Sequence, residues 1–192
     1  MAIYRYIITA DTGMAPAIDE ALLSLATCKP QIRKSAQPGD WVLACRGSPA
    51  PTGLIAWAAR IERKVGIGRY EREYRGRSDA VYRERPDGSY ERLRPDYHDS
   101  PEDQQKDLSG PALVFARQAS WYFGDRPQLL PDHLQHLAPR GQGHRVNGSL
   151  AGDEQALVDW LQSRGPPGLH GRPPDQDACG GCVPKPARSP GW

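Results

Sequence analysis

Short β-rich segments, broken by turns that contain proline and glycine, are the feature that most restricts how this chain can fold. Residues 3–9, 41–45, 53–64 and 112–117 are rich in Ile, Val, Leu, Ala, Tyr and Trp, the residue types favoured in strands and cores. The segments between them do not form a regular series of crossover helices, and no glycine-rich phosphate loop follows a strand. This pattern argues against Rossmann and P-loop folds.

Weaker signals add a hairpin and several helices. Residues 80–83 and 90–93 are brief strand candidates on either side of a Pro-Asp-Gly-Ser turn. Apolar residues recur at helical spacing over residues 17–25, and residues 131–137 and 153–164 are also helix candidates. We therefore expect the α+β class, in which five or six short strands make a small, partly open β-barrel with flanking helices.

The composition changes near residue 165. Twelve of the last 27 residues are Pro or Gly, and few large apolar side chains remain. Such a segment cannot offset the entropy lost on ordering. The sequence therefore predicts a domain over residues 1–165 and a disordered tail over residues 166–192.

Several classes of protein are disfavoured. No apolar run is long enough for a transmembrane helix, and no secretion signal precedes the first strand, so we expect a cytoplasmic protein with no membrane partner. Cys28 and Cys45 have apolar surroundings typical of core residues. Cys179 and Cys182 form a CxxC that could be half of a zinc site with His170, but no second CxxC or HxxxH exists. We expect no metal and no cofactor, and we interpret the acidic residues between 96 and 107 as a solvated run.

The charge distribution says little about partners, because the formal net charge is only +2. Residues 60–94 nevertheless carry 11 Arg or Lys against 7 acidic residues, with four tyrosines between them. Arginine and aromatic side chains together suit phosphates and stacked bases. An ion-paired, solvated strand surface explains the same spacing.

Seven short motifs occur in an order that is similar to the order of motifs in one protein family. They are Asp11-Thr12-Gly13 with Ala15-Pro16, Cys28-Lys29-Pro30 with Ile32-Arg33, Gly39-Asp40-Trp41, Arg77-Ser78-Asp79 with Tyr82, Lys106-Asp107-Leu108, Tyr122-Phe123-Gly124 and Gly143-His144-Arg145. Over roughly residues 3–165 the chain resembles the second of the nucleotide-modification-associated domain families. These domains occur in phage and bacterial systems that make or handle modified DNA bases.

The resemblance implies a PUA-like barrel and a pocket for a modified base or nucleotide. In PUA-like readers a flipped base is stacked on aromatic side chains and hydrogen-bonded at its edge. The implied ligand-binding residues are Asp11, Thr12, Gly13, Cys28, Lys29, Arg33, Trp41, Arg77, Asp79, Tyr82, Tyr122, His144 and Arg145. Of these, we expect Trp41 or Tyr82 and Tyr122 to stack, Asp11 and Asp79 to accept from the base edge, and Lys29, Arg33, Arg77 and Arg145 to hold phosphate.

An enzyme on the same barrel is the alternative. Some relatives of the implied fold are amidohydrolases that use a lysine, a threonine and a carboxylate, and Lys29, Thr27 and Asp11 could supply these groups. The chain would then be a hydrolase or transferase acting on a modified nucleoside. The implied partners are modified DNA or a nucleotide, with base-modification or restriction enzymes encoded nearby. The sequence does not choose between the reader and the enzyme.

Overall fold

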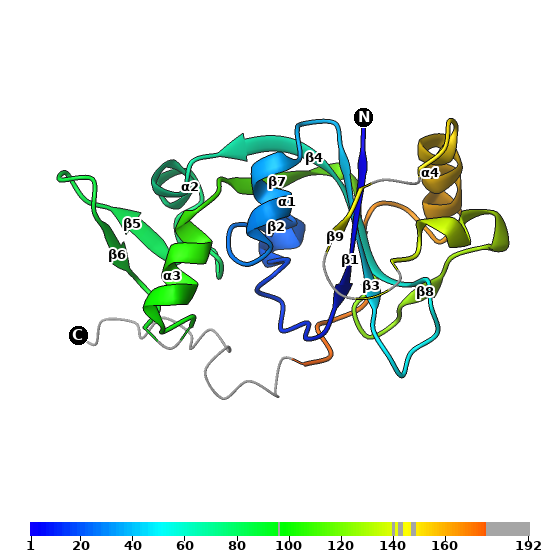
Figure 1. Cartoon of the computed structure of the whole chain (residues 1–192), viewed down its shortest axis with the longest axis horizontal. Coiled ribbons are helices and arrows are strands. Elements are labelled where there is room, and N and C mark those ends of the chain that lie inside the picture. The colour runs from blue at the N-terminus through cyan, green and yellow to red at the C-terminus, as the bar shows by residue number, and fades with distance from the viewer. Residues whose placement is uncertain (96, 140, 142–143, 147–148, 176–192) are drawn as a thin grey trace.

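A curled, mostly antiparallel sheet forms the centre of the molecule (Figure 1). The computed structural model describes residues 1–95, 97–139, 141, 144–146 and 149–175. The long strands are β1 (Ile3–Ile8), β3 (Trp41–Arg46), β4 (Leu54–Val65) and β7 (Ala112–Tyr122). The short strands β2 (Ser24–Leu25), β8 (Gln128–Leu129), β9 (His144–Arg145) and β10 (Gly168–Leu169) extend it.

The strand order is β10-β7-β4-β3-β1-β9, with β2 also paired to β7 and β8 to β4. Within the described residues β9 and β10 are the two ends of this order and do not pair with each other, so the sheet is a half-barrel. The expected α+β class and partly open barrel are confirmed at this level.

One crossover connection is present in the sheet. Strands β1 and β3 pair in parallel, from Ile3 opposite Trp41 to Ile8 opposite Arg46. Parallel neighbours need a connection that returns the chain to the same end of the sheet. The helix α1 (Pro30–Ser35) lies on that connection and packs Ile32 and Ala36 against the sheet.

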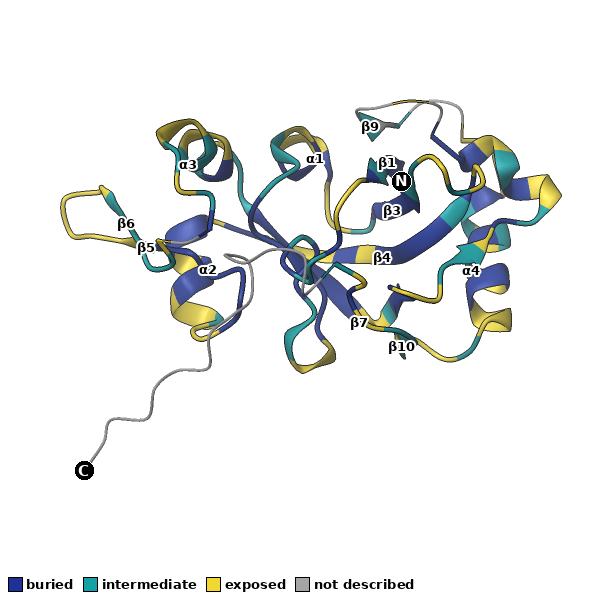
Figure 2. Ribbon diagram, turned by 90° about the horizontal axis from the view of Figure 1, so that it is seen from below, coloured by how far each residue is buried: buried dark blue, intermediate teal, exposed yellow. Residues whose placement is uncertain are grey.

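The two faces of the sheet carry separate cores. Tyr4, Tyr6 and Ile8 of β1 alternate onto the face that α1 covers, as the two-residue period of a strand requires. Ile3 lies on the opposite face. That face is covered by the 3₁₀ helix η2 (Asp132–Leu137) and the helix α4 (Asp153–Ser163). Figure 2 shows the long strands between these layers buried over most of their length.

A β-bulge in β4 places two consecutive residues, Ala56 and Trp57, on the same face of the sheet. Ala44 pairs with Trp57 and Cys45 pairs with Ile55, which leaves Ala56 as the extra residue. A bulge re-aims the side chains beside it. Ala56 and Trp57 consequently both join the face that carries Tyr6.

A smaller lobe packs beside the end of β4 and the start of β7 (Figure 1, left). It contains α2 (Ile67–Glu73), the hairpin of β5 (Tyr82–Glu84) and β6 (Tyr90–Arg92), and α3 (Pro101–Leu108). Its apolar residues form a third core. The hairpin is confirmed, whereas the two helices lie in a stretch for which the sequence predicts only brief strands.

The predicted helix over residues 17–25 is wrong. Ala17 and Ser24 exchange two backbone hydrogen bonds around a short 3₁₀ turn, η1 (Asp19–Ala21), and Ser24–Leu25 then pairs with β7 as β2. Every residue from 22 to 26 is buried. Where all positions are buried, the spacing of apolar residues does not distinguish a helix from a strand.

The expectation of disorder is wrong for residues 166–175. Strand β10 pairs in parallel with the end of β7. Farther along, Asp175 exchanges hydrogen bonds with the backbone of Asp11, at 2.7 and 3.1 Å. Residues 176–192, with Cys179 and Cys182, lie outside the described residues. No described helix is long and apolar enough to cross a membrane.

Candidate functional site

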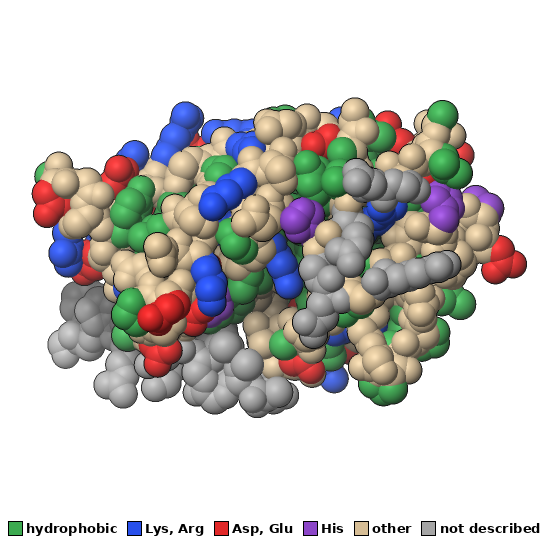
Figure 3. Space-filling model, in the orientation of Figure 1, with side chains coloured by type: hydrophobic (Ala, Val, Ile, Leu, Met, Phe, Trp, Pro, Cys, Tyr) green, Lys and Arg blue, Asp and Glu red, His purple; other side chains and the backbone are tan. Residues whose placement is uncertain are grey.

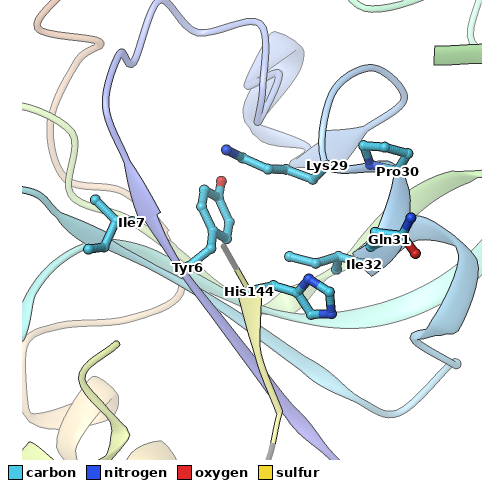
Figure 4. Close-up of a pocket in the computed structure, with 7 residues that line it drawn as sticks. All are labelled: Tyr6, Ile7, Lys29, Pro30, Gln31, Ile32 and His144. Carbon is cyan, nitrogen blue, oxygen red and sulfur yellow. The ribbon is translucent and has the colours of Figure 1, made fainter. Parts of the chain in front are cut away.

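A pocket of about 150 Å³ lies between β1, β9 and the start of α1 (Figure 4). Ligand pockets more often measure ~300–1,000 Å³, so this one fits a single ring or a substituent. It is lined by Tyr6, Ile7, Lys29, Pro30, Gln31, Ile32 and His144.

Tyr6 brings an unsatisfied hydroxyl to this pocket. The residue is 2% exposed, and its Oη has no hydrogen-bond partner among the described residues. The Trp57 Nε1, on the same face of the sheet, interacts with the Tyr6 hydroxyl and lowers its pKa, but the two atoms do not reach hydrogen-bond geometry and Nε1 is otherwise buried without a partner. Burial raises the pKa of Tyr6, so this hydroxyl remains a neutral donor and acceptor. Buried polar atoms without partners are rare and costly in native structures.

Lys29 places a cation beside the same ring. It lies immediately before α1 in a left-handed conformation (φ 41°), and Pro30 begins the helix. Its Nζ lies 4.5 Å from the centre of the Tyr6 ring, within cation–π range. Burial lowers the pKa of Lys29. In Figure 4 the Lys29 side chain extends toward Tyr6, with the ammonium group near the hydroxyl end of the ring.

His144 completes the ring of polar groups around the pocket. It lies opposite Tyr6 in the β1–β9 register and stacks on Tyr4 with ring centres 6.4 Å apart. The strand pairing therefore fixes an imidazole, a phenol and an ammonium group around one small cavity.

A second cluster begins at the residue before Lys29. The Cys28 Sγ lies 3.5 Å from His98 Nε2, and the His98 Nδ1 lies 2.7 Å from Asp107 Oδ2. The Cys28 backbone N–H donates to Asp107 Oδ1 at 2.8 Å. Burial on its own lowers the pKa of His98, but the hydrogen bonds to Asp107 and Cys28 outweigh it and raise that pKa to about 10.

The expected acidic run is therefore wrong at Asp107. That carboxylate is fully buried and also accepts from the Tyr82 hydroxyl at 3.2 Å. The helix α3 carries it inward, because Ser100 caps the helix by accepting from the Asp103 backbone N–H and Pro101 begins it. A serine followed by proline and acidic residues is a helix-start signal that could have been found in the sequence.

Arg33 and Arg77, expected to hold phosphate, lie in the interior. The Arg33 guanidinium donates to backbone carbonyls of the β2–α1 connection and of residues 106–111. Arg77 donates to the Asp19 and Leu22 carbonyls and to the Ser24 and Tyr70 hydroxyls. Both side chains tie loops together, and neither lines the pocket.

The two expected base-edge acceptors are also internal. Asp79 accepts from Ser24 and Tyr70, each at 2.7 Å. Asp11 accepts from the Tyr122 hydroxyl at 2.8 Å and lies 3.4 Å from Arg46. Burial raises the pKa of both carboxyl groups, as desolvation disfavours their charged forms.

The three expected stacking residues have other neighbours. Trp41 is on the far face of the sheet, stacked on Trp121 and bonded through Nε1 to Glu154. Tyr82 and Tyr122 are buried, with their hydroxyls directed to Asp107 and Asp11. The aromatic ring at the pocket is instead Tyr6.

The remaining expected residues are spread over the fold. The Thr27 hydroxyl lies 3.0 Å from the Tyr97 hydroxyl, so Thr27, Lys29 and Asp11 each have a different neighbour. Thr12 and Gly13 lie in a loop covered by Pro173. Arg145 pairs through its backbone with Arg5. The structure brings Lys29 and His144 together at the pocket and places Cys28 next to Lys29.

One family model matches the chain. Its description is nucleotide modification associated domain 2, and it matches residues 1–89, slightly less than half of the chain. No curated protein and no solved structure matches. The matched region contains Tyr6, Cys28 and Lys29 but ends before His98, Asp107 and His144. It is consistent with a role in nucleotide modification systems.

Proposed function

We propose that this chain binds a modified base or nucleotide, with the base or its modifying group in the pocket formed by Tyr6, Lys29 and His144. The observation that carries the proposal is the grouping of Tyr6, Lys29 and His144 around one pocket, where the buried Tyr6 hydroxyl makes no hydrogen bond of good geometry. A ligand that supplies its hydrogen bond would remove this cost. The match to a nucleotide-modification-associated domain gives the class of ligand.

The pocket offers what a substituted base needs. The Lys29 ammonium group donates to an exocyclic oxygen, and the Tyr6 hydroxyl donates or accepts. The size of the cavity, about 150 Å³, favours one ring or one substituent and leaves sugar and phosphate outside. The open, curled sheet supports the comparison with PUA-like readers, in which a base leaves the stack to enter a pocket.

The test is titration of the protein with a panel of modified and unmodified nucleosides and short oligonucleotides. Tyr6→Phe removes only the unpaired hydroxyl, so it should leave the free energy of unfolding unchanged or slightly raised. It should weaken binding of the preferred ligand by about threefold to tenfold, the value of one hydrogen bond. Tyr122→Phe is the matched control, because its hydroxyl bonds to Asp11 and not to the pocket.

A second pair of variants tests the cation. Lys29→Met keeps an apolar stem over Tyr6 but removes the charge, so it should weaken binding more than Tyr6→Phe does. Lys34→Met changes an exposed lysine of α1, the helix that follows Lys29, and should leave affinity unchanged. Equal loss in both lysine variants, or no binding to any member of the panel, would contradict the proposed site.

A further inference from the structure

We propose that Cys28, His98 and Asp107 form a nucleophilic site that cleaves an amide or ester by acyl transfer to the Cys28 sulfur. The proposal of the site depends only on the geometry of these three residues. The identification of its substrate as an acylated base or nucleotide rests on the proposed binding function.

The geometry is that of a nucleophile, a proton-transfer group and an orienting carboxylate. A thiol nucleophile needs an imidazole within reach, and the imidazole needs a partner that fixes its ring. The Sγ–Nε2 distance of 3.5 Å and the Nδ1–Oδ2 distance of 2.7 Å meet both needs, and contacts to the nucleophile are often long before substrate binds.

Further contacts hold the three groups in register. Asp107 accepts from the Cys28 backbone with one oxygen and contacts His98 with the other, so one carboxylate positions both partners. The Tyr97 ring stacks on His98 with centres 4.1 Å apart. Asp107 is fully buried, whereas Cys28 and His98 are partly exposed. This distribution leaves the reacting groups open to a substrate.

Two features of the described residues serve as internal comparisons. Cys45 is buried on the far face of the sheet, and burial raises the pKa of its thiol to about 12. His136 contacts Asp153 at 2.8 Å, a second imidazole–carboxylate pair at which no described cysteine lies. Of the cysteines in the described part of the chain, Cys28 is the one paired with an imidazole.

The proposed reaction is balanced in atoms and electrons and needs no external oxidant or reductant. The Cys28 thiolate attacks the acyl carbon, a carbon–sulfur bond forms, and the carbon–nitrogen or carbon–oxygen bond breaks. The His98 Nε2 proton passes to the departing amine or alcohol. Water then attacks the thioester as neutral His98 takes its proton, which releases a carboxylic acid and restores the thiolate and the imidazolium.

The site adjoins the pocket through the peptide that joins Cys28 to Lys29. A base held by Lys29 and Tyr6 would carry its substituent next to the sulfur. The proposed binding and the proposed chemistry would then act on one ligand.

The experiment uses the full chain with Cys179 and Cys182 replaced by serine, and p-nitrophenyl acetate as the probe. We expect release of more than one p-nitrophenolate per chain, with an acetyl group found on Cys28 by mass spectrometry. Cys28→Ser should abolish the release. His98→Gln and Asp107→Asn should each slow acylation by roughly a hundredfold, while His136→Gln should leave the rate unchanged.

Acylation of Cys28 at the same rate in the wild-type and His98→Gln proteins, or no acylation at all, would overturn the proposal. Thermal melting checks that each variant is folded. If the His98 and Asp107 variants unfold, the test rests on the number of p-nitrophenolate molecules that the wild-type chain releases. Release of one per chain or of none would then overturn the catalytic role. The probe is not a nucleotide, so this result is independent of whether nucleotide binding is found.

Discussion

Whether a buried polar side chain has hydrogen-bond partners and lies beside a cavity distinguishes structural residues from candidate functional ones. Arg77 and most donors of Arg33 are buried and directed to carbonyls and hydroxyls, while the Arg33 Nε has no partner within the described residues and Arg33 does not line the pocket. Tyr6 is as deeply buried, yet its hydroxyl has no partner within the described residues. A satisfied buried group is explained by folding, whereas an unsatisfied one beside a cavity calls for a ligand. For this reason the candidate site is the pocket beside Tyr6 and not the buried arginines.

The paired imidazole should make stability depend on pH. The pKa of His98 is raised from 6.5 to about 10 in the folded protein, so folding favours its protonated form. That contribution is complete below pH 6.5 and is lost as the pH rises toward about 10. We expect the free energy of unfolding to fall by about 2–4 kcal/mol over this window.

The measurement is chemical denaturation of wild type and His98→Gln at several pH values. The variant lacks the titrating group, so its stability should depend less on pH and the difference between the two proteins should shrink as the pH rises. A constant difference across the window would show that His98 does not gain its proton affinity from folding.

The sequence identified some site residues and missed others for physical reasons. Lys29, Cys28 and His144 could be named from the sequence because they belong to the motifs on which the family resemblance rests. Tyr6 did not, since an alternating strand already accounts for a buried tyrosine. His98 and Asp107 are nine residues apart, and only the start of α3 between them brings the imidazole onto the carboxylate.

At the scale of elements, the local sequence pattern correctly predicted the long strands and the helix α4. It did not predict the structure of three other segments. Residues 17–25 have helical spacing, but residues 22–26 around β2 are all buried, so the spacing of apolar residues does not report the secondary structure there. The helix α3 exposes most of its surface and has little apolar pattern to detect. Residues 166–175 gain order from β7 and from Asp11, contacts that lie far away in the sequence.

The packing of this last segment can be tested at Gly171. A Cβ there would lie 2.0 Å from the Phe123 carbonyl oxygen, a backbone atom that cannot move aside easily. Gly171→Ser should therefore lower the free energy of unfolding by about 1–3 kcal/mol, as overpacking does elsewhere. Equilibrium denaturation measures the change.

Gly66 is the matched control. It precedes α2 as the N-cap, and nothing lies within 4 Å of its Cβ position. Serine is favoured at this helix position, so Gly66→Ser should leave stability unchanged or slightly improved. Equal stability of the two serine variants would mean that residues 168–175 are not packed on β7.

For the molecule as a whole, one face of the sheet forms a closed core and the opposite face carries the pocket. The face under η2 and α4 is filled by Trp41, Trp121 and apolar helix residues, which makes it a closed core. The opposite face is covered by the short α1, and the pocket lies where α1, β1 and β9 meet. The β4 bulge adds Trp57 to this second face. A rigid core behind an incompletely covered face suits a small binding site.

The distribution of charge predicts how binding should respond to salt. Figure 3 shows Lys and Arg side chains scattered over the visible face among acidic ones, not gathered in a patch. Lys29 is the one Lys or Arg among the described residues that line the pocket. Lys29 contacts the base in the proposed complex and phosphate stays outside the pocket, so affinity for a modified oligonucleotide should depend only weakly on salt, with a log–log slope of magnitude about 1 or less and most of the binding energy from base contacts.

The measurement is the same titration repeated over a range of salt concentrations, with wild type and Lys29→Met compared. Lys29→Met should lower affinity at every salt concentration and change the slope little, because Lys29 contacts the base and not a phosphate, while Lys34→Met should change neither the affinity nor the slope. The preference for the modified over the unmodified oligonucleotide should persist at high salt, because phosphate contacts carry no information about the base. A steep slope of six or more, with no such preference, would instead indicate that scattered surface cations bind the backbone and that the pocket takes no part.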